Sequence, residues 1–151
     1  MKGNGKIEIV PIGVIRTPYK EAGEVPIQAS RSSARGTIEV FREYEEGLKD
    51  VEGFSHVVIL FHFHKSGITR LLTKPFLDDV LRGVFATRSP NRPNHLGISV
   101  VRLLARRGNL LEVEGVDMLD GTPLIDIKPY VSKFDDTATV RIGWLEGKLN
   151  R

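Results

Sequence analysis

The stretch from Ala86 to Asn94 (ATRSPNRPN) concentrates polar and conformationally restricted residues. Its two prolines fix their own φ angles and restrict the residues before them, so the backbone around Arg88 and Arg92 should be stiff. A rigidly placed guanidinium can grip a carboxylate or a phosphate with two parallel hydrogen bonds. We therefore interpret this loop as a binding element for an anionic group. The alternative is a surface loop whose arginines only face water.

A second polar segment runs from Met118 to Tyr130 (MLDGTPLIDIKPY). The D-G-T-P sequence that begins at Asp120 is typical of a tight turn in which the aspartate caps its own backbone. Alternatively, this carboxylate and the exposed amides of the turn could bind the hydroxyls or ammonium group of a small ligand. Farther along, Asp126 and Lys128 share a strand face by parity, and a salt bridge between them is the simplest interpretation.

Histidines are concentrated in one apolar run over 54–64, where His56, His62 and His64 share a parity. An H-x-H pair can ligate zinc from one strand. The remaining histidine, His95, lies by the stiff loop, and nothing marks it as completing a metal set. We expect no metal site, and we favour a histidine that hydrogen-bonds a ligand or the backbone. With no G-x-S-x-G pattern and no cysteine, a hydrolase is also hard to build.

The composition is that of one ordinary globular domain, which we expect to span 1–151. The chain has no run of about 18 apolar residues and no signal-like N-terminus, so neither a membrane span nor secretion is expected. The absence of cysteine excludes disulfides and thiolate metal sites, and the cytoplasm is the expected location. A net charge of +3 suits either simple solubility or a phosphate-bearing partner.

Short runs rich in β-branched and aromatic residues predict strands over 7–16, 36–41, 54–64, 83–87, 96–105, 110–116, 124–128 and 139–144. The run over 54–64 is apolar at both parities and should lie centrally in a sheet. Gly108-Asn109 accepts positive φ and predicts a hairpin between two of these strands.

Helix is expected only over 69–81, interrupted at Pro75, and as one turn over 43–48, while 17–35 is interpreted as a long loop. Many short strands with little helix indicate an all-β fold, an antiparallel barrel or sandwich. No βαβ alternation and no G-x-G-x-x-G motif after a strand are present, so a Rossmann-type cofactor domain is not expected.

Four motifs follow one another in an order that resembles a known family. They are PIQ at Pro26–Gln28, FSHVVILFHFHKS at Phe54–Ser66, GVFATRSPNRPNHLGISVV at Gly83–Val101 and DGTPLIDIKPYV at Asp120–Val131. Together they resemble the TsaA-like (TrmO) family, over about 12–144. The resemblance implies a small closed or partly open antiparallel β-barrel with long loops. It also implies a homodimer that binds S-adenosylmethionine near the subunit interface and methylates N6 of threonylcarbamoyl-adenosine, beside the anticodon in tRNA.

Matching the motifs residue by residue, the resemblance implies that three parts of the chain contact the cofactor. These residues are Pro26, Ile27 and Gln28, then His64, Lys65, Arg88 and Ile98, and finally Asp120, Gly121 and Thr122. The chain departs from the commoner family pattern at Lys65, Asn91 and His95, where glutamine, an aromatic residue and proline are frequent. These departures concern the substrate more than the cofactor.

The implied chemistry needs no nucleophilic side chain, because S-adenosylmethionine already carries an activated methyl group and alignment does most of the work. A hydrogen-bond acceptor at the adenine amine would help it react and would finally take its proton. We assign this role to Asp126, with Tyr130 as its neighbour or as a stacking platform. The D-x-x-P-Y spacing is only an analogy to the acidic-Pro-Pro-Tyr motif of other adenine N6-methyltransferases.

We assign the phosphate contacts of the tRNA to four arginines, Arg31, Arg35, Arg92 and Arg106. Two other functions remain open. One is a barrel that binds an adenine nucleotide or RNA without catalysis, and the other is a methyltransferase with a small-molecule acceptor.

Overall fold

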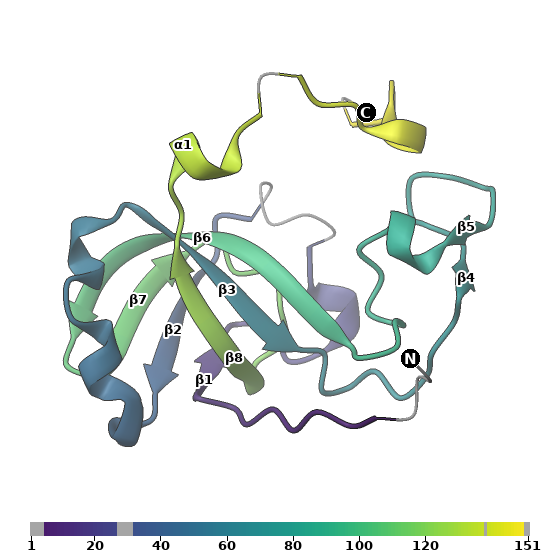
Figure 1. Cartoon of the computed structure of the whole chain (residues 1–151). Helices are drawn as coiled ribbons and strands as arrows, with labels where there is room; N and C mark the ends of the chain where they lie inside the picture. Colours follow the sequence, from purple (N-terminus) through teal and green to yellow (C-terminus); the bar gives the residue numbers. More distant parts are fainter. Residues whose placement is uncertain (1–4, 27–31, 138, 150–151) are drawn as a thin grey trace.

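The computed structural model describes residues 5–26, 32–137 and 139–149. In this part of the chain, six antiparallel strands close into a barrel in the order β1-β2-β7-β6-β3-β8 (Figure 1). The barrel strands are β1 (Gly13–Arg16), β2 (Arg35–Val40), β3 (His56–His62), β6 (Leu96–Arg107), β7 (Leu110–Glu114) and β8 (Thr122–Pro129). The predicted all-β antiparallel barrel with little helix is confirmed, and the barrel is closed.

The remaining elements are short. They are the two-stranded sheet β4 (Leu72–Thr73) and β5 (Arg82–Gly83), the helix α1 (Ser132–Asp135) and the 3-10 turns η1 (Ala22–Glu24), η3 (Arg42–Leu48), η4 (Val51–Gly53), η5 (Val84–Ala86) and η6 (Gly143–Leu145). Within the described ranges, no helix has the length and apolar character needed to cross a membrane.

The core fills the barrel with the inward-facing residues of every strand. In β3 the buried positions alternate, so Val57, Ile59 and Phe61 point inward while the residues between them are half-buried on the outside. Gly97 of β6 is the register partner of Phe61. A Cβ added at Gly97 would lie 2.5 Å from the Phe61 ring and 2.8 Å from the Phe63 ring. A side chain at this position would therefore collide with two aromatic rings.

Antiparallel closure places three connections at one end of the barrel. Round the barrel, the strands β1, β7 and β3 alternate with β2, β6 and β8, and every neighbouring pair is antiparallel, so β1, β3 and β7 run in one direction and the other three run in the opposite direction. The connections over 17–34, 63–95 and 115–121 therefore leave from the same end, which we call the loop end. The connection over 63–95, which carries β4 and β5 and which we call the arm, lies beside the barrel (Figure 1).

After β8 the chain crosses from the barrel back to the arm (Figure 1). The indole Nε1 of Trp144 donates a hydrogen bond of 2.8 Å to the carbonyl of Ala86. The Arg82 guanidinium and the Lys148 ammonium lie 5.6 Å and 5.5 Å from the centre of the same ring. The C-terminal segment is thus fastened to the arm through Trp144.

Several predicted elements are confirmed with shifted ends. The hairpin between β6 and β7 turns at Gly108, whose φ is +61°. The predicted strand over 54–64 is β3, which lies between β6 and β8. The first strand is shorter than predicted, because β1 begins only at Gly13, after Pro11, which has no amide proton to donate to a ladder.

Three predictions were wrong. The region over 69–81 forms β4 and turns rather than helix, because Pro75 interrupts any helix there and Leu72 pairs instead with Gly83. The strand predicted over 83–87 is limited to the short β5, followed by η5. No strand forms in the described part of 139–144, since a closed barrel offers no free edge with which these residues could pair.

Candidate functional site

The loop end gathers most of the residues that the motifs assign to the cofactor. Pro26 comes from the first connection, His64, Lys65 and Arg88 from the arm, and Asp120, Gly121 and Thr122 from the third connection and the start of β8. Ile27, Gln28 and Arg31 lie outside the described residues. Segments far apart in the sequence therefore meet at one end because the strands alternate in direction.

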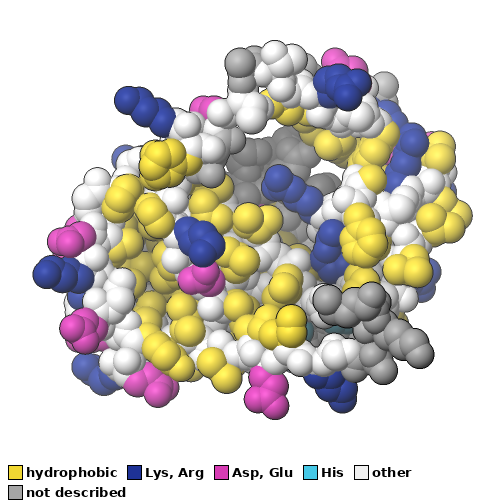
Figure 2. All heavy atoms as spheres, viewed as in Figure 1, with side chains coloured by type: hydrophobic (Ala, Val, Ile, Leu, Met, Phe, Trp, Pro, Cys, Tyr) yellow, Lys and Arg dark blue, Asp and Glu magenta, His cyan; other side chains and the backbone are white. Residues whose placement is uncertain are grey.

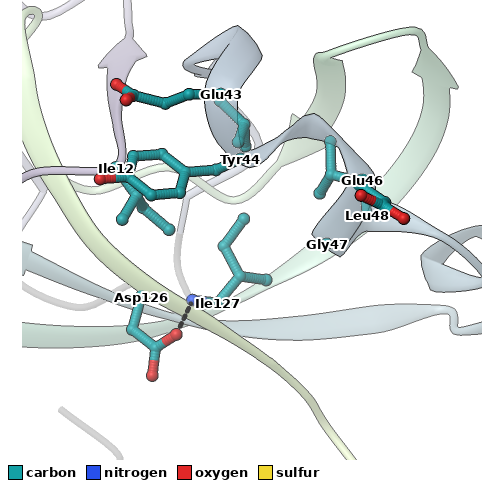
Figure 3. Close-up of a pocket in the computed structure, with 9 residues that line it drawn as sticks. Ile12, Glu43, Tyr44, Glu46, Gly47, Leu48, Asp126 and Ile127 are labelled. Carbon is teal, nitrogen blue, oxygen red and sulfur yellow. Dashed lines mark hydrogen bonds between the residues drawn. The ribbon is translucent and has the colours of Figure 1, made fainter.

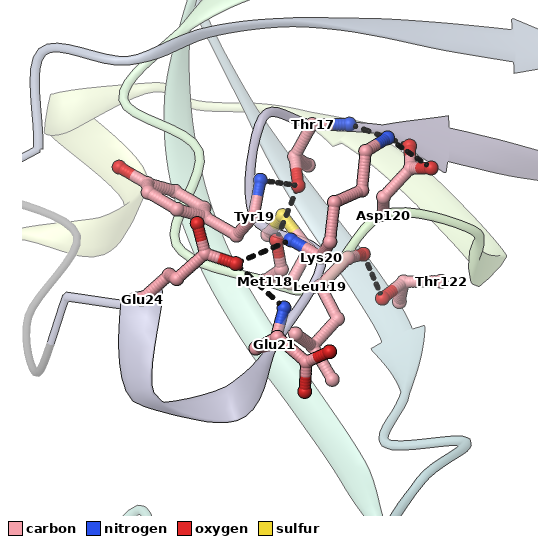
Figure 4. Close-up of polar contacts among 9 residues, drawn as sticks. All are labelled: Thr17, Tyr19, Lys20, Glu21, Glu24, Met118, Leu119, Asp120 and Thr122. Carbon is pink, nitrogen blue, oxygen red and sulfur yellow. Dashed lines mark hydrogen bonds and ion pairs between the residues drawn. The ribbon is translucent and has the colours of Figure 1, made fainter.

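Asp120 ties two of these connections together (Figure 4). Its Oδ1 accepts a hydrogen bond of 3.0 Å from the Thr17 amide, and its Oδ2 lies 2.7 Å from Lys20 Nζ. The hydrogen bond from Lys20, with help from the Thr17 amide, holds the pKa of this carboxyl below its ordinary value. The next residue, Gly121, has a φ of +81° and donates its amide to the Ile15 carbonyl at 2.9 Å. The carboxylate therefore stays ionised and faces the first connection.

Further hydrogen bonds stiffen the same region (Figure 4). Thr17 Oγ1 donates to the Met118 carbonyl at 2.8 Å and accepts the Tyr19 amide at 3.1 Å. Thr122 is buried, and its hydroxyl donates to the Leu119 carbonyl at 2.5 Å. The first and third connections thus form one hydrogen-bonded unit at the barrel mouth.

The stiff loop of the arm is held by Arg92 as well as by its prolines. Arg92 Nη1 donates to the carbonyls of Thr87 and Ser89, at 2.9 Å and 3.1 Å. Ser66 reaches the same loop, where its hydroxyl donates to Asn91 Oδ1 at 3.0 Å. These bonds support the predicted rigidity of the loop. They also use Nη1 of Arg92 inside the loop, so this nitrogen is not available to a phosphate.

Asp117 is a candidate site residue that the motifs did not identify. The buried Ser99 hydroxyl donates to its Oδ1 at 2.6 Å, and the carboxyl group is largely enclosed. Burial raises the pKa of Asp117, against the opposing effects of the Ser99 hydrogen bond and the positive charge of Arg88. One signal was available in the sequence: Ser99 is a polar residue at the same parity as the apolar residues that point inward from its strand.

His64 lies beyond the end of β3, in the turn that starts the arm. Burial, followed by the charge of Lys65, lowers the pKa of its imidazole, so a neutral ring is favoured. The expected row of three histidines on one strand is therefore wrong, because the strand ends at His62. The His62 ring packs edge-on against His95, with centroids 6.3 Å apart. The described residues bring together no three His, Asp or Glu side chains that could hold a metal ion.

Ile98 and Asp126 lie in one outward-facing row of the barrel. Both are register partners of Leu60, one on each side, so their Cα atoms are about 10 Å apart. Asp126 Oδ2 lies 3.0 Å from Lys128 Nζ, which confirms the predicted shared face and salt bridge. Leu60 lies two residues before the end of β3, so Ile98 and Asp126 lie on the outer face of the barrel close to the loop end.

Tyr130 follows β8 and lies at the far side from the loop end. Its hydroxyl donates to Asp136 at 3.3 Å, and its ring meets His56 edge-on with centroids 6.4 Å apart. Asp126 itself lines a shallow groove between β8 and η3 (Figure 3). The groove combines apolar side chains with two glutamates, Glu43 and Glu46, so it is unsuited to a phosphate.

The arginines predicted to bind RNA have different surroundings. Arg106 is mostly buried at the opposite end of the barrel, where it donates to the carbonyls of Gly108 and Leu48, at 2.8 Å and 3.2 Å, and pairs with Glu52 at 3.3 Å. Arg35 is exposed and lies 3.7 Å from Glu114. Of the three described arginines of this set, Arg92 and Arg106 thus donate to backbone carbonyls, and Arg35 pairs with a glutamate.

The chain matches the family model described as "tRNA-methyltransferase O N-terminal domain" over residues 14–136. A Pyrococcus abyssi protein named as a probable S-adenosyl-L-methionine-binding protein is 55% identical over 93% of this chain and 77% of its own length. The human protein named tRNA (adenine(37)-N6)-methyltransferase is 36% identical over 90% of this chain.

A crystal structure of TrmO superposes with a TM-score of 0.79, at 40% identity over 92% of this chain. The chain spans 64% of that solved chain and 33% of the human protein. The family predicted from the four motifs is confirmed: the chain belongs to the tRNA-methyltransferase O N-terminal domain family.

Proposed function

We propose that this protein transfers a methyl group from S-adenosylmethionine to N6 of an adenosine beside the anticodon of tRNA, with threonylcarbamoyl-adenosine as the acceptor. The family match over 14–136 carries this proposal. It is supported by one relative named for S-adenosylmethionine binding and another named for methylating adenine 37 of tRNA. A cytoplasmic location belongs to the same proposal, since a chain without cysteine suits a reducing compartment.

The charges at the loop end suit the proposed cofactor. S-adenosylmethionine carries a carboxylate, an ammonium group and a sulfonium ion. The exposed guanidinium of Arg88 can grip a carboxylate, while Asp117 and Asp120 provide negative charge for the cationic groups. The neutral imidazole of His64 can accept or donate a hydrogen bond. Both signs of charge are therefore available on a stiffened framework.

The cofactor supplies the activated methyl group, so the protein has to align the reactants and accept a proton. Two carboxylates can take the second role. Asp126, with Tyr130 as its neighbour, is the candidate from the sequence, and Asp117 is a partly buried carboxyl group at the loop end that forms no ion pair with a described residue. Asp126→Asn and Asp117→Asn test them separately, with kcat and the affinity for the cofactor measured in each. The variant that loses turnover while its cofactor affinity is retained identifies the carboxylate that accepts the proton.

A homodimer is part of the proposal, and the outer face of β3, β6 and β8 suits it. Figure 2 shows hydrophobic side chains gathered over these strands. Ile98 and Val100 are 51% and 41% exposed there, and Leu60 and Val58 lie beside them in the register. A second copy on this face would bury the apolar stripe and place Ile98 and Asp126 at the subunit interface. Both would then lie where the family resemblance implies the cofactor.

The decisive experiment incubates the purified protein with methyl-labelled S-adenosylmethionine and total tRNA, followed by mass spectrometry of the tRNA nucleosides. The expected product is N6-methylated threonylcarbamoyl-adenosine. Calorimetric binding of the cofactor shows that the sample is competent. If cofactor and tRNA bind but no methyl is transferred, a binding module is the better description. If the cofactor binds and only a small adenine compound is methylated, the proposed methyl acceptor, an adenosine of tRNA, is wrong.

A further inference from the structure

The positive charge of this chain is concentrated in the arm. Residues 63–95 contain six Lys or Arg and two Asp, a net charge of +4. The whole chain has a net charge of +3, so the remainder of the chain has a net charge of −1. The basic character of the protein is thus a local property of one connection beside the barrel. Such a concentration favours a polyanionic partner over general solubility.

The arm also exposes two aromatic rings. Phe76 is 82% exposed and Phe85 is 76% exposed, although phenylalanine is usually buried. On the side of the molecule where the arm lies, Figure 2 shows hydrophobic side chains next to Lys and Arg side chains. Aromatic rings interleaved with cations are the pattern by which proteins bind unpaired nucleic acid strands, because any base can stack on such a ring.

Among the cations of the arm that the motifs do not assign to the cofactor, two are available for phosphates. Arg82 is bonded to Asp78 and stacked on Trp144, and Arg92 donates into its own loop. By contrast, Arg70 and Lys74 are exposed, and neither forms an ion pair with any described residue. These two side chains can therefore release counterions when a phosphate binds.

The arm is held next to the candidate site. The Arg70 amide donates to the Asn91 carbonyl at 2.8 Å, which joins the outer part of the arm to the stiff loop that carries Arg88. A strand bound along the arm would therefore run toward the loop end.

We propose that the arm is a binding surface for an unpaired RNA strand, with Phe76 and Phe85 as stacking platforms and Arg70 and Lys74 as phosphate contacts. This inference rests on the proposed function for the identity of the RNA, the anticodon loop of a tRNA. It moves the RNA interface away from Arg92 and Arg106, whose guanidinium groups donate to backbone carbonyls.

A second copy of the chain is the competing occupant of this surface. If the arms met at a two-fold axis, each arm would face the same arm of the partner, which would bring two net charges of +4 together. The stripe over β3, β6 and β8 has apolar residues at its centre and carries no such charge. The arm also exposes aliphatic side chains, among them Leu71, Leu72 and Leu81, so its positive charge is the property that favours RNA over a second copy, and the oligomeric state is measured together with RNA binding.

The test measures binding of a fluorescent RNA hairpin with the sequence of an anticodon stem and loop, by anisotropy at several salt concentrations. One variant combines Arg70→Gln with Lys74→Gln, and a second combines Phe76→Ala with Phe85→Ala. The matched control combines Arg42→Gln with Lys49→Gln, which removes the same charge from exposed positions in and beside η3. All affected side chains are exposed, so equal thermal unfolding midpoints are expected for every protein.

The charge variant should bind the hairpin at least about tenfold more weakly. The slope of the logarithm of its binding constant against the logarithm of the salt concentration should be smaller in magnitude by about 1.4, the value for two phosphate contacts on a single strand. The aromatic variant should lose about fivefold or more for each base that no longer stacks, with an unchanged salt dependence. The control should match the wild type.

Failure of this inference is distinct from failure of the proposed function. If the wild type does not bind the hairpin, or if the arm variants bind it as tightly as the wild type, the inference is overturned. It is also overturned if the aromatic variant keeps its RNA affinity but sediments as a smaller species, since the arm is then a subunit contact. The proposed function is judged separately, by methyl transfer from the wild type to tRNA.

Discussion

The hydroxyl of Ser99 donates a 2.6 Å hydrogen bond to Asp117, joining the start of β6 to the connection that leads into β8. Ser99 is only 4% exposed, so this polar pair lies where the barrel interior opens into the loop end. Burial raises the pKa of Asp117, although Ser99 and Arg88 both favour its charged form.

The stability of the Asp117→Asn variant, relative to that of the wild type, should increase as pH rises. A carboxyl whose pKa is raised by folding contributes stability below its unfolded pKa, about 4, and loses that contribution as pH rises through the folded value. Asparagine keeps a partner for Ser99 without this titration. Thermal unfolding followed by circular dichroism between about pH 4 and pH 7 tests this, with Asp79→Asn as the exposed control. A difference between variant and wild type that is independent of pH would contradict it.

The attachment of the C-terminal segment to the arm should weaken in acid. Hydrogen bonds from Arg82 and Lys148 hold the pKa of Asp78 far below its ordinary value. The stability that Asp78 contributes is present above its unfolded pKa, about 4, and is lost as pH falls below it toward the depressed folded value.

Trp144 is the single tryptophan, so its fluorescence reports this attachment directly. The wild type should show a spectral change in acid before the barrel unfolds. Asp78→Asn should already show the released spectrum at neutral pH, whereas Asp79→Asn should behave as the wild type. An unaltered spectrum in Asp78→Asn would mean that the indole hydrogen bond alone holds the segment.

Gly97→Ala should destabilise the barrel by about 1–3 kcal/mol. The new methyl group would lie 2.5 Å from the Phe61 ring and 2.8 Å from the Phe63 ring, which is too close for ordinary contact. Chemical denaturation gives the free energy of unfolding. Gly53→Ala is the matched control, because an added Cβ there has no atom within 4 Å. Equal destabilisation of the two variants would show that the rings move aside.

Arg92→Ala should loosen the stiff loop rather than simply remove a phosphate contact. The two carbonyls that Arg92 Nη1 now binds, those of Thr87 and Ser89, would lose a charged donor, at a cost of about 1–2 kcal/mol for this partly exposed pair. Limited proteolysis should cut the loop sooner, and calorimetry should show weaker cofactor binding, because Arg88 loses its support. A protein that loses only RNA affinity, with a flatter salt dependence, would instead favour the original assignment of Arg92 to RNA.

The strands and the family could be predicted from the sequence because those signals are local. The alternation of buried residues along β3 and the Gly108 turn depend on neighbouring residues only. The same is true of the four motifs. Local patterns gave the wrong secondary structure where the conformation of a segment depends on residues outside it. The segment over 139–144 has strand-like residues but no edge of the barrel to pair with. In the segment over 69–81, Leu72 and Thr73 pair with Gly83 and Arg82 instead of forming a helix.

The arrangement of the candidate site was decided by the tertiary structure. Barrel closure brings three distant connections to one end, pairs Asp117 with Ser99 and sets Asp126 beside Ile98 on the outer face. It also places the Arg106 guanidinium against the Leu48 carbonyl, which is 58 positions away in the sequence. Residue type determines which interactions a side chain can make. Only the folded chain determines which partner reaches it first, because hydrogen bonds and ion pairs act over a few ångströms while the residues concerned are up to about a hundred positions apart.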